Sequence, residues 1–507
     1  MFAINRMFSD HMILQRHQLI KIWGTGKPDL QLNIQLLTSH HQVLDSQQAT
    51  VSSDGHWLVE LSAQEAHYDL TLVVTDGATC IRYKDVCIGE VWLAGGQSNM
   101  KYQIHFDADK KAILSHSLNP NIRFFNYPQL SIPEMEESFD YSDYGFWRCA
   151  TKDDLPHLSS VAYHFANDIS QDLNIPIGII GCTWGGTPAC AWLDKRYLEN
   201  TQGSVWLSDP VHSEIDLEQE KEKYLADPNN DTSHPLKLLP GLKGKMMFPG
   251  LTETEQNQLL DEMLGGETAS VGPFHHCRAG GLFDNMVSHI APFTISGVIW
   301  YQGESDFLHA NVYQQVFTQL IQCWRDLWHE ELPFLFVQLA PFARWMQFDG
   351  SEYPELRRQQ QKVQETVPKT WMVSASDAGM EIDIHPKIKQ PIGQRLALLA
   401  LKYIYGKNIL ADAPKFKQAD KTHDCICITF DHAAGLHING TNLEALVLED
   451  ENGHLVEYLE TEIYGNVLIV KGCFEQKVTV KFASTPFYKV NLYNQSQIPA
   501  LPFEVVI

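Results

Sequence analysis

The chain has 507 residues, a hydrophobic fraction of 44% and a formal charge of −24, from 38 basic and 62 acidic side chains. This length exceeds one hydrophobic core, so we expect about two to four domains. The excess of acidic side chains disfavours binding to nucleic acid or to an anionic membrane surface, because both need a basic protein surface. A neutral sugar stays open as a ligand, and so does an acidic sugar at a site with a local Arg or Lys.

Residues 1–88 contain short alternating runs that are typical of β-strands, such as "LNIQLLTS" and "HYDLTLVVTDG". Asp54-Gly55 and Asp76-Gly77 lie between such runs, and Asp-Gly pairs favour hairpin turns. The sequence therefore predicts an N-terminal β-sandwich-like domain at 1–88, with no evident chemistry of its own.

Residues 89–409 alternate buried-looking strands with helical periodicity, which predicts a largely parallel sheet in a three-layer α/β domain. Ligand sites in such sheets lie at the carboxyl ends of the strands, where "GGQSNM", "TWGGTP" and "YQGESD" occur. Charged helical pieces at about 200–275 interrupt this alternation of strands and helices and predict an insertion over or beside the site. Short β runs return at 410–507 and predict a C-terminal β domain. The expected helices are 158–173, 311–328, 355–367 and 392–406.

Ser98 follows the apolar run "VWLA" and two glycines. A serine at such a turn presents its hydroxyl and its backbone N–H at the edge of the sheet, where it can serve as a nucleophile. Met100 replaces the second glycine of G-x-S-x-G, which disfavours an α/β-hydrolase elbow. The alternative is a turn serine that caps the next helix.

His385 is the candidate general base, because a histidine before a proline is held on an extended loop and titrates near neutral pH. Three carboxylates are candidates to orient it. Asp383 lies two residues before it, whereas Glu304 and Asp377 follow other predicted strands. Any one of them could instead be a solvated or structural charge.

Gly185, Gly186 and Gln302 could supply N–H donors to a developing oxyanion, although the glycines could also simply permit a turn beside Trp184. No metal site is predicted. "HHC" at 275–277 has ligand types without a metal-binding spacing, and the ten cysteines contain no C-x-x-C pair and suggest reduced thiols.

Taken in order, "FSDHMILQR", "GEVWLAGGQSNM", "GCTWGGTPACAWL", "LFDNMVSHIAPFTISGVIWYQGESD", "LPFLFVQLAPF" and "DIHPKIKQPIGQRLALLAL" resemble the sialate O-acetylesterase family of the SGNH hydrolases. The resemblance implies a flavodoxin-like catalytic sheet, Ser98 as nucleophile and His385 as base. It also implies Gly185, Gln302 and Asn99 as oxyanion or substrate-binding residues, and no cofactor.

The resemblance leaves both Asp383 and Glu304 open as the acid. It implies removal of O-acetyl groups from acetylated sugars, either O-acetyl sialic acid or an acetylated glycan such as xylan, through an acetyl-serine intermediate. A non-catalytic carbohydrate-binding protein on an esterase scaffold is the alternative. A protease or lipase is disfavoured, since neither an apolar lid nor G-x-S-x-G is evident.

No stretch approaches the roughly 20 apolar residues of a membrane-spanning helix, and no signal peptide is visible at the start. The sequence therefore predicts a cytoplasmic protein, or a secreted or periplasmic one if a leader has been removed. Homo-oligomerisation stays open.

Overall fold

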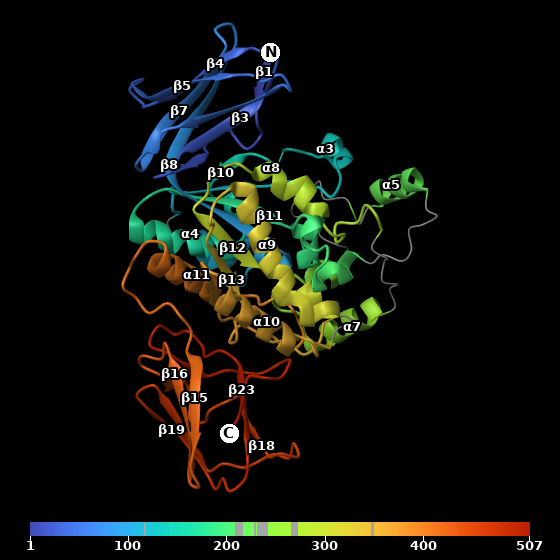
Figure 1. Ribbon diagram of the computed structural model, residues 1–507, viewed down its shortest axis with the longest axis vertical. Coiled ribbons are helices and arrows are strands. Elements are labelled where there is room, and N and C mark those ends of the chain that lie inside the picture. Colours follow the sequence, from blue (N-terminus) through green and yellow to red (C-terminus); the bar gives the residue numbers. More distant parts are fainter. Residues whose placement is uncertain are drawn as a thin grey trace. The chain divides into compact units, whose positions relative to one another are not determined.

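A computed structural model of the chain (Figure 1) has a mixed α/β fold with several sheets, in agreement with the predicted class. It describes residues 1–115, 118–142, 144–207, 216–227, 230, 242–264, 272–345 and 349–507. The chain divides into two compact units. The first comprises residues 1–239, 269–300 and 318–334, and the second comprises residues 240–268, 301–317 and 335–507.

The first unit begins with β-strands, as the alternating runs predicted. One sheet has the order β1 (Phe2–Ile4), β3 (Ile20–Gly26), β6 (His56–Leu61). In the other sheet β4 (Gln31–Leu37) pairs with β5 (Val43–Thr50) and β7 (His67–Thr75), while β8 (Cys80–Gly96) pairs with β7 and with the short β2 (Ile13–Gln15). All of these pairs are antiparallel except β2 with β8. Gly55 and Gly77 have φ angles of 84° and 89°, which explains the need for glycine in these two turns.

Strand β8 changes character along its length. Its first six residues alternate between more and less exposed positions, whereas every residue from Val86 to Gly96 is buried. A strand that is buried on both faces has a nearly continuous apolar sequence. In β8 this sequence is the segment that leads to Ser98. The predicted domain boundary at residues 88 and 89 falls inside this strand, and the domain boundaries stay a prediction.

The buried half of β8 belongs to a sheet with the order β10-β9-β11-β8-β12 in this unit. Strand β11 is parallel to both β8 and β9, and its register pairs Thr183 with Gly96. The carboxyl ends of β8 and β11 therefore lie side by side, as the strand-end motifs predicted. The bounds are β9 (Ile122–Asn126), β10 (Trp147–Cys149), β11 (Ile177–Thr183) and β12 (Gly297–Tyr301).

Helices cover both faces of β8. Trp92 contacts Phe165 of α4 (Ser160–Leu173) edge to face at 5.1 Å. A Cβ at Gly95 would lie 3.3 Å from Trp324 of α9 (Tyr313–Trp328). Because positions 92 and 95 point to opposite faces of a strand, α4 and α9 pack on opposite sides. The N-cap Ser159 accepts a hydrogen bond from Ala162 N at 3.2 Å, which fixes the start of α4.

In the second unit, β13 (Phe334–Val337) lies next to β14 (Thr370–Val373), and α10 (Tyr353–Thr366) and α11 (Gln390–Tyr403) each pack against β14. Both helices carry a proline in the first turn, where a missing N–H costs no hydrogen bond. The four predicted helices are thus confirmed, with ends that differ by up to three residues.

The C-terminal part of the second unit, from β15 onward, is β structure with its own apolar core, which includes Ile426, Phe430, Leu468 and Phe482. Three sheets surround this core, in the orders β15-β16-β20-β19, β17-β22 and β18-β21-β23. Their bounds are β15 (Lys415–Lys421), β16 (Cys425–Asp431), β17 (His437–Ile438), β18 (Leu446–Glu449), β19 (Glu460–Tyr464), β20 (Val467–Lys471), β21 (Thr479–Phe482), β22 (Leu492–Tyr493) and β23 (Phe503–Val506).

Short helices connect these elements. They are α1 (Ser98–Lys101), η1 (Ile104–Phe106), α2 (Lys110–Ser115), α3 (Glu134–Ser138), η2 (Leu155–His157), η3 (Ala189–Trp192), η4 (Lys195–Tyr197), η5 (Gln202–Leu207), α5 (Leu217–Ala226), α6 (Leu242–Lys245), α7 (Glu253–Leu264), η6 (Phe283–Val287), α8 (Ser288–Ile290) and η7 (Glu304–Val312). The charged pieces expected in the insertion are helical at α5 and α7, and other parts of it lie outside the described residues. Among the helices that the structure describes, none combines the length and the apolar character needed to cross a membrane.

Candidate active site

Ser98 is the first residue of α1, directly after the sharp bend that ends β8. Gly96 has a φ of 130°, and a Cβ at Gly95 would come within 2.8 Å of the Trp300 ring. Both glycines are therefore required, one by backbone conformation and the other by close packing. Gln97 occupies the N-cap position, so Ser98 does not fill the N-cap role that we considered as the alternative. Ser98 is half-buried, whereas Asn99 is only 1% exposed.

The turn after β11 lies against Ser98. A Cβ at Gly185 would be 3.3 Å from the Ser98 Cβ, so only a residue without a side chain leaves room between them. The turn is fixed from several sides. Trp184 N donates to Gly96 O at 3.0 Å, and Thr187 Oγ1 donates to Trp184 O at 2.7 Å. The predicted neighbours Ser98 and Gly185 are thus brought together, with the backbone of Gly185 held in place.

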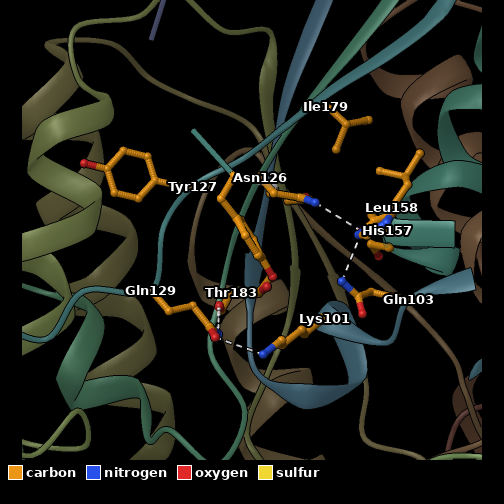
Figure 2. Close-up of a pocket in the computed structure, with 13 residues that line it drawn as sticks. Lys101, Gln103, Asn126, Tyr127, Gln129, His157, Leu158, Ile179 and Thr183 are labelled. Carbon is orange, nitrogen blue, oxygen red and sulfur yellow. Dashed lines mark hydrogen bonds between the residues drawn. The ribbon is translucent and has the colours of Figure 1, made fainter. Parts of the chain in front are cut away.

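A partly buried chain of hydrogen bonds, not anticipated from the sequence, links α1 to this turn (Figure 2). Lys101 Nζ donates to Gln129 Oε1 at 2.9 Å, and Gln129 Nε2 donates to Thr183 O at 2.7 Å. Burial lowers the pKa of Lys101 to about 8. The three residues line a small cavity of about 20 Å³. Lys101 lies three residues after Ser98 on the same face of the helix, which is the one sequence signal that could have found it.

The "HHC" segment also packs against this turn. The His276 ring stacks on Trp184 at 4.8 Å and 10°, and Cys277 Sγ donates to Gly186 O at 3.2 Å. Burial, with smaller contributions from His275 and Lys101, lowers the pKa of His276 to about 3, so it is neutral. The ligand atoms of residues 275–277 lie within 4.8 Å of one another. They are of the right types for a metal, but they are already used in packing this turn.

In the second unit, His385 lies between β14 and α11 and contacts Asp383. Asp383 Oδ1 accepts a hydrogen bond from His385 N at 2.8 Å and lies 3.0 Å from His385 Nδ1. A proton on Nδ1 is consistent with this contact and leaves Nε2 as the acceptor. Burial lowers the pKa of His385 below 6.5, although Asp383 acts in the opposite direction. Neutral His385 is the form that a general base requires.

Asp383 is itself held by a cation. Lys387 Nζ lies 2.6 Å from Asp383 Oδ2 and donates to Met246 O at 2.7 Å. Burial alone would raise the pKa of Asp383, but the hydrogen bond from His385 and the charge of Lys387 outweigh it and lower the pKa. The Trp345 ring stands edge-on to His385 at 5.2 Å. The imidazole is therefore fixed by a carboxylate that stays ionised.

The other two carboxylate candidates are placed differently. Asp377 forms a bidentate ion pair with Arg395, in which Nη1 and Nη2 lie 2.7 and 2.6 Å from Oδ1 and Oδ2. This geometry is typical of a structural charge. Glu304 is 5% exposed at the start of η7, and its backbone carbonyl accepts from Tyr353 Oη at 3.3 Å.

Gln302 is fully buried, and its side-chain amide is oriented by two neighbours. Nε2 donates to Asp306 Oδ2 at 2.5 Å, and Tyr313 Oη donates to Gln302 Oε1 at 3.2 Å. A primary amide carries two N–H groups, both of which can donate hydrogen bonds. Asp306 and Tyr313 were not anticipated from the sequence.

Comparisons with known proteins show which proteins the chain is similar to. Residues 259–402 match the family described as "Carbohydrate esterase, sialic acid-specific acetylesterase". The chain is 24% identical to the mouse sialate O-acetylesterase over 99% of its own length and 94% of the relative, and 26% identical to the rat protein over 85% and 79%. The crystal structure of a carbohydrate acetylesterase from Xanthomonas citri superposes with a TM-score of 0.75 at 24% identity, covering 100% of this chain and 99% of the other.

These findings place the chain among the carboxylic ester hydrolases. More particularly, they confirm the predicted resemblance to the sialate O-acetylesterase family.

Proposed function

We propose that the protein is a serine O-acetylesterase that removes acetyl groups from sugars, with an SGNH-like catalytic sheet. The observation that carries the proposal is the buried pair of His385 and Asp383, with Nδ1 and Oδ1 3.0 Å apart. A neutral imidazole whose Nδ1 is engaged by a carboxylate is the general base that a serine nucleophile needs. The half-buried Ser98 at the end of β8 is the serine that the sequence motifs supply.

In the proposed first step, Ser98 Oγ attacks the acetyl carbonyl carbon while His385 Nε2 takes the hydroxyl proton. The negative charge that develops on the carbonyl oxygen is stabilised by the backbone N–H groups of Ser98 and Gly185 and by the Gln302 amide. Preorganised donors are effective because they need no rearrangement as the charge forms. The hydrogen bonds that fix the Gly185 turn and the Gln302 amide support this role.

Collapse of the intermediate breaks the bond between the acetyl carbon and the sugar oxygen, and His385 gives its proton to that oxygen. Water then attacks the acetyl-serine, with His385 again as the base, and acetate leaves. Asp383 keeps its charge throughout and stabilises the imidazolium form of His385. We propose Asp383 as the orienting acid, in preference to Glu304, because of its contact with His385 and its low pKa.

The proposed substrates are O-acetylated sugars. The names of the relatives support this class, since they are called sialate O-acetylesterases and a carbohydrate acetylesterase. The acidic balance of the chain, with a charge of −24, argues against nucleic acid as a partner.

The test is hydrolysis of p-nitrophenyl acetate, 9-O-acetyl sialic acid and acetylated xylo-oligosaccharides by the wild type, by Ser98→Ala and by Ser53→Ala. Ser53 is exposed and serves as the matched control. We expect Ser98→Ala to lose nearly all turnover on every substrate and Ser53→Ala to keep it. Equal rates for the wild type and Ser98→Ala would refute the serine mechanism. Sugar binding without turnover by the wild type would favour the non-catalytic alternative.

A further inference from the structure

The first unit contains a second hollow, apart from the predicted catalytic residues. A cleft of about 670 Å³ lies between β3, the N-terminal segment, the segment after β9, α3 and the end of α8. Its size falls within the roughly 300–1,000 Å³ that is usual for small-molecule sites. None of its lining residues is a predicted catalytic or oxyanion residue.

Several aromatic side chains line the cleft, and contacts with neighbouring residues hold them in place. Trp23 is half-buried and meets Phe8 edge to face at 4.7 Å and 78°. Tyr141 lies under the guanidinium of Arg6, which is 4.2 Å from the ring centroid. Tyr127 Oη is 3.2 Å from His289 Nδ1. Rings that are already fixed lose little freedom on binding, and their faces suit the apolar faces of sugar rings.

The charges in the cleft are balanced. Besides two imidazoles, its charged side chains are Arg6 and Glu136, with Nε and Oε1 3.7 Å apart. Their side chains are 63% and 45% exposed, so both are within reach of a ligand. A guanidinium only donates and a carboxylate only accepts, whereas a sugar hydroxyl does both and can bond to either. An anionic ligand that contacts both side chains would be repelled by the Glu136 carboxylate, and a cationic one would be repelled by the Arg6 guanidinium. A neutral polyol meets neither repulsion, so it is the ligand that this pair favours.

We propose that this cleft binds a short neutral oligosaccharide. Fixed aromatic rings beside a compensated pair of opposite charges match the two sides of a neutral sugar, its apolar ring face and its hydroxyl groups. This site does not depend on the serine mechanism, because it requires neither Ser98 nor His385.

The experiment is calorimetric titration of the full chain with unacetylated xylotetraose, cellotetraose and mannotetraose, and with 3′-sialyllactose as an acidic comparator. The cleft variants are Trp23→Ala and Arg6→Ala. If removal of the half-buried Trp23 ring impairs folding, the result for Arg6→Ala is used to test the proposal. Tyr464→Ala is the matched control, since Tyr464 is 81% exposed on β19.

We expect the wild type to bind at least one neutral tetrasaccharide, and each cleft variant to bind it about tenfold more weakly. We expect Tyr464→Ala to bind as the wild type does, and p-nitrophenyl acetate hydrolysis to be unchanged in all three variants. Three results would overturn the proposal: no binding of any neutral tetrasaccharide, binding that neither cleft variant weakens, or binding of 3′-sialyllactose alone. Failure of the esterase proposal is detected separately, by Ser98→Ala in the hydrolysis assay.

Discussion

Replacing Asp383 by Asn tests the proposed base and its orienting acid. Asp383 is 4% exposed, and its two oxygens have different partners. Oδ1 faces the backbone N and Nδ1 of His385 at 2.8 and 3.0 Å, and Oδ2 pairs with Lys387 at 2.6 Å. Asn keeps the shape of the side chain but removes its charge and replaces one acceptor oxygen with a donor. The substitution therefore changes the electrostatics of His385 with little change in volume.

Two effects set the size of the loss. A hydrogen bond to a charged group stabilises by about 1.5–3 kcal/mol, which corresponds to about 10- to 150-fold in rate. The Asn amide can also hold His385 with its proton on Nε2, which then cannot accept the proton of Ser98, and in a Ser-His-Asp triad this costs about 10⁴-fold. We expect kcat for Asp383→Asn to fall by about 10²- to 10⁴-fold, with KM nearly unchanged.

The assay is steady-state hydrolysis of p-nitrophenyl acetate, with circular dichroism to establish that the variants are folded. Lys387→Met separates the two roles of Asp383, because it removes the ion pair and keeps the contact with His385. We expect Lys387→Met to lose less activity than Asp383→Asn, because the contact with His385 remains although a charge that lowers the pKa of Asp383 is removed. Glu304→Gln is the rival variant. The assignment is wrong if folded Asp383→Asn keeps wild-type activity while Glu304→Gln loses it.

Three further predictions follow from the site. Burial lowers the pKa of His385 below its ordinary 6.5, so kcat/KM should rise with pH through a midpoint below 6.5 and then stay level, as a pH-rate profile will test. In Gly185→Ala the new methyl would lie 3.3 Å from the Ser98 Cβ and crowd the nucleophile, so kcat should fall by about 10- to 100-fold in steady-state kinetics. Lys101→Met removes the bond to Gln129 at 2.9 Å and loosens the turn, so kcat should fall about tenfold with KM unchanged.

Matched variants control the last two predictions. A Cβ at Gly272 would meet nothing within 4 Å, so Gly272→Ala should keep wild-type kcat. Lys111 is exposed on α2, so Lys111→Met should do the same. If Gly272→Ala loses as much activity as Gly185→Ala, crowding of Ser98 is not the cause. If Lys111→Met matches Lys101→Met, a general effect of charge replaces the proposed positioning role. An inflection of kcat/KM at or above pH 6.5 would contradict the lowered pKa of His385.

Much of the fold could be predicted because its signals are local. The periodicity at 158–173 and 311–328 gave helices α4 and α9 with ends that differ by at most two residues. The long strand β8 shows the limit of such reasoning. Its change from an alternating to a continuously buried pattern at Val86 reads as a change of domain, although the backbone continues as one strand. Hydrophobic pattern reports burial, and it does not report whether a strand is interrupted.

In the candidate site, too, contacts between residues near in sequence could be predicted, and contacts between distant residues could not. Asp383 and His385 are two residues apart, so their pairing was among the sequence alternatives. The partner of Asp377 is Arg395, 18 residues further on in α11, and only the packed structure reveals that ion pair. Lys101 was not anticipated because lysines are mostly solvated surface charges, and its half-buried position depends on Gln129, a partner 28 residues away.

The proposed mechanism requires that Ser98 carries the acetyl group during turnover. The direct measurement is acid quenching of the wild-type protein during p-nitrophenyl acetate hydrolysis, followed by proteolysis and mass spectrometry. We expect an acetyl group on the peptide that contains Ser98, localised to that hydroxyl and absent from Ser98→Ala. An active enzyme whose acetyl group lies on another residue, or that turns over equally well as Ser98→Ala, would contradict it.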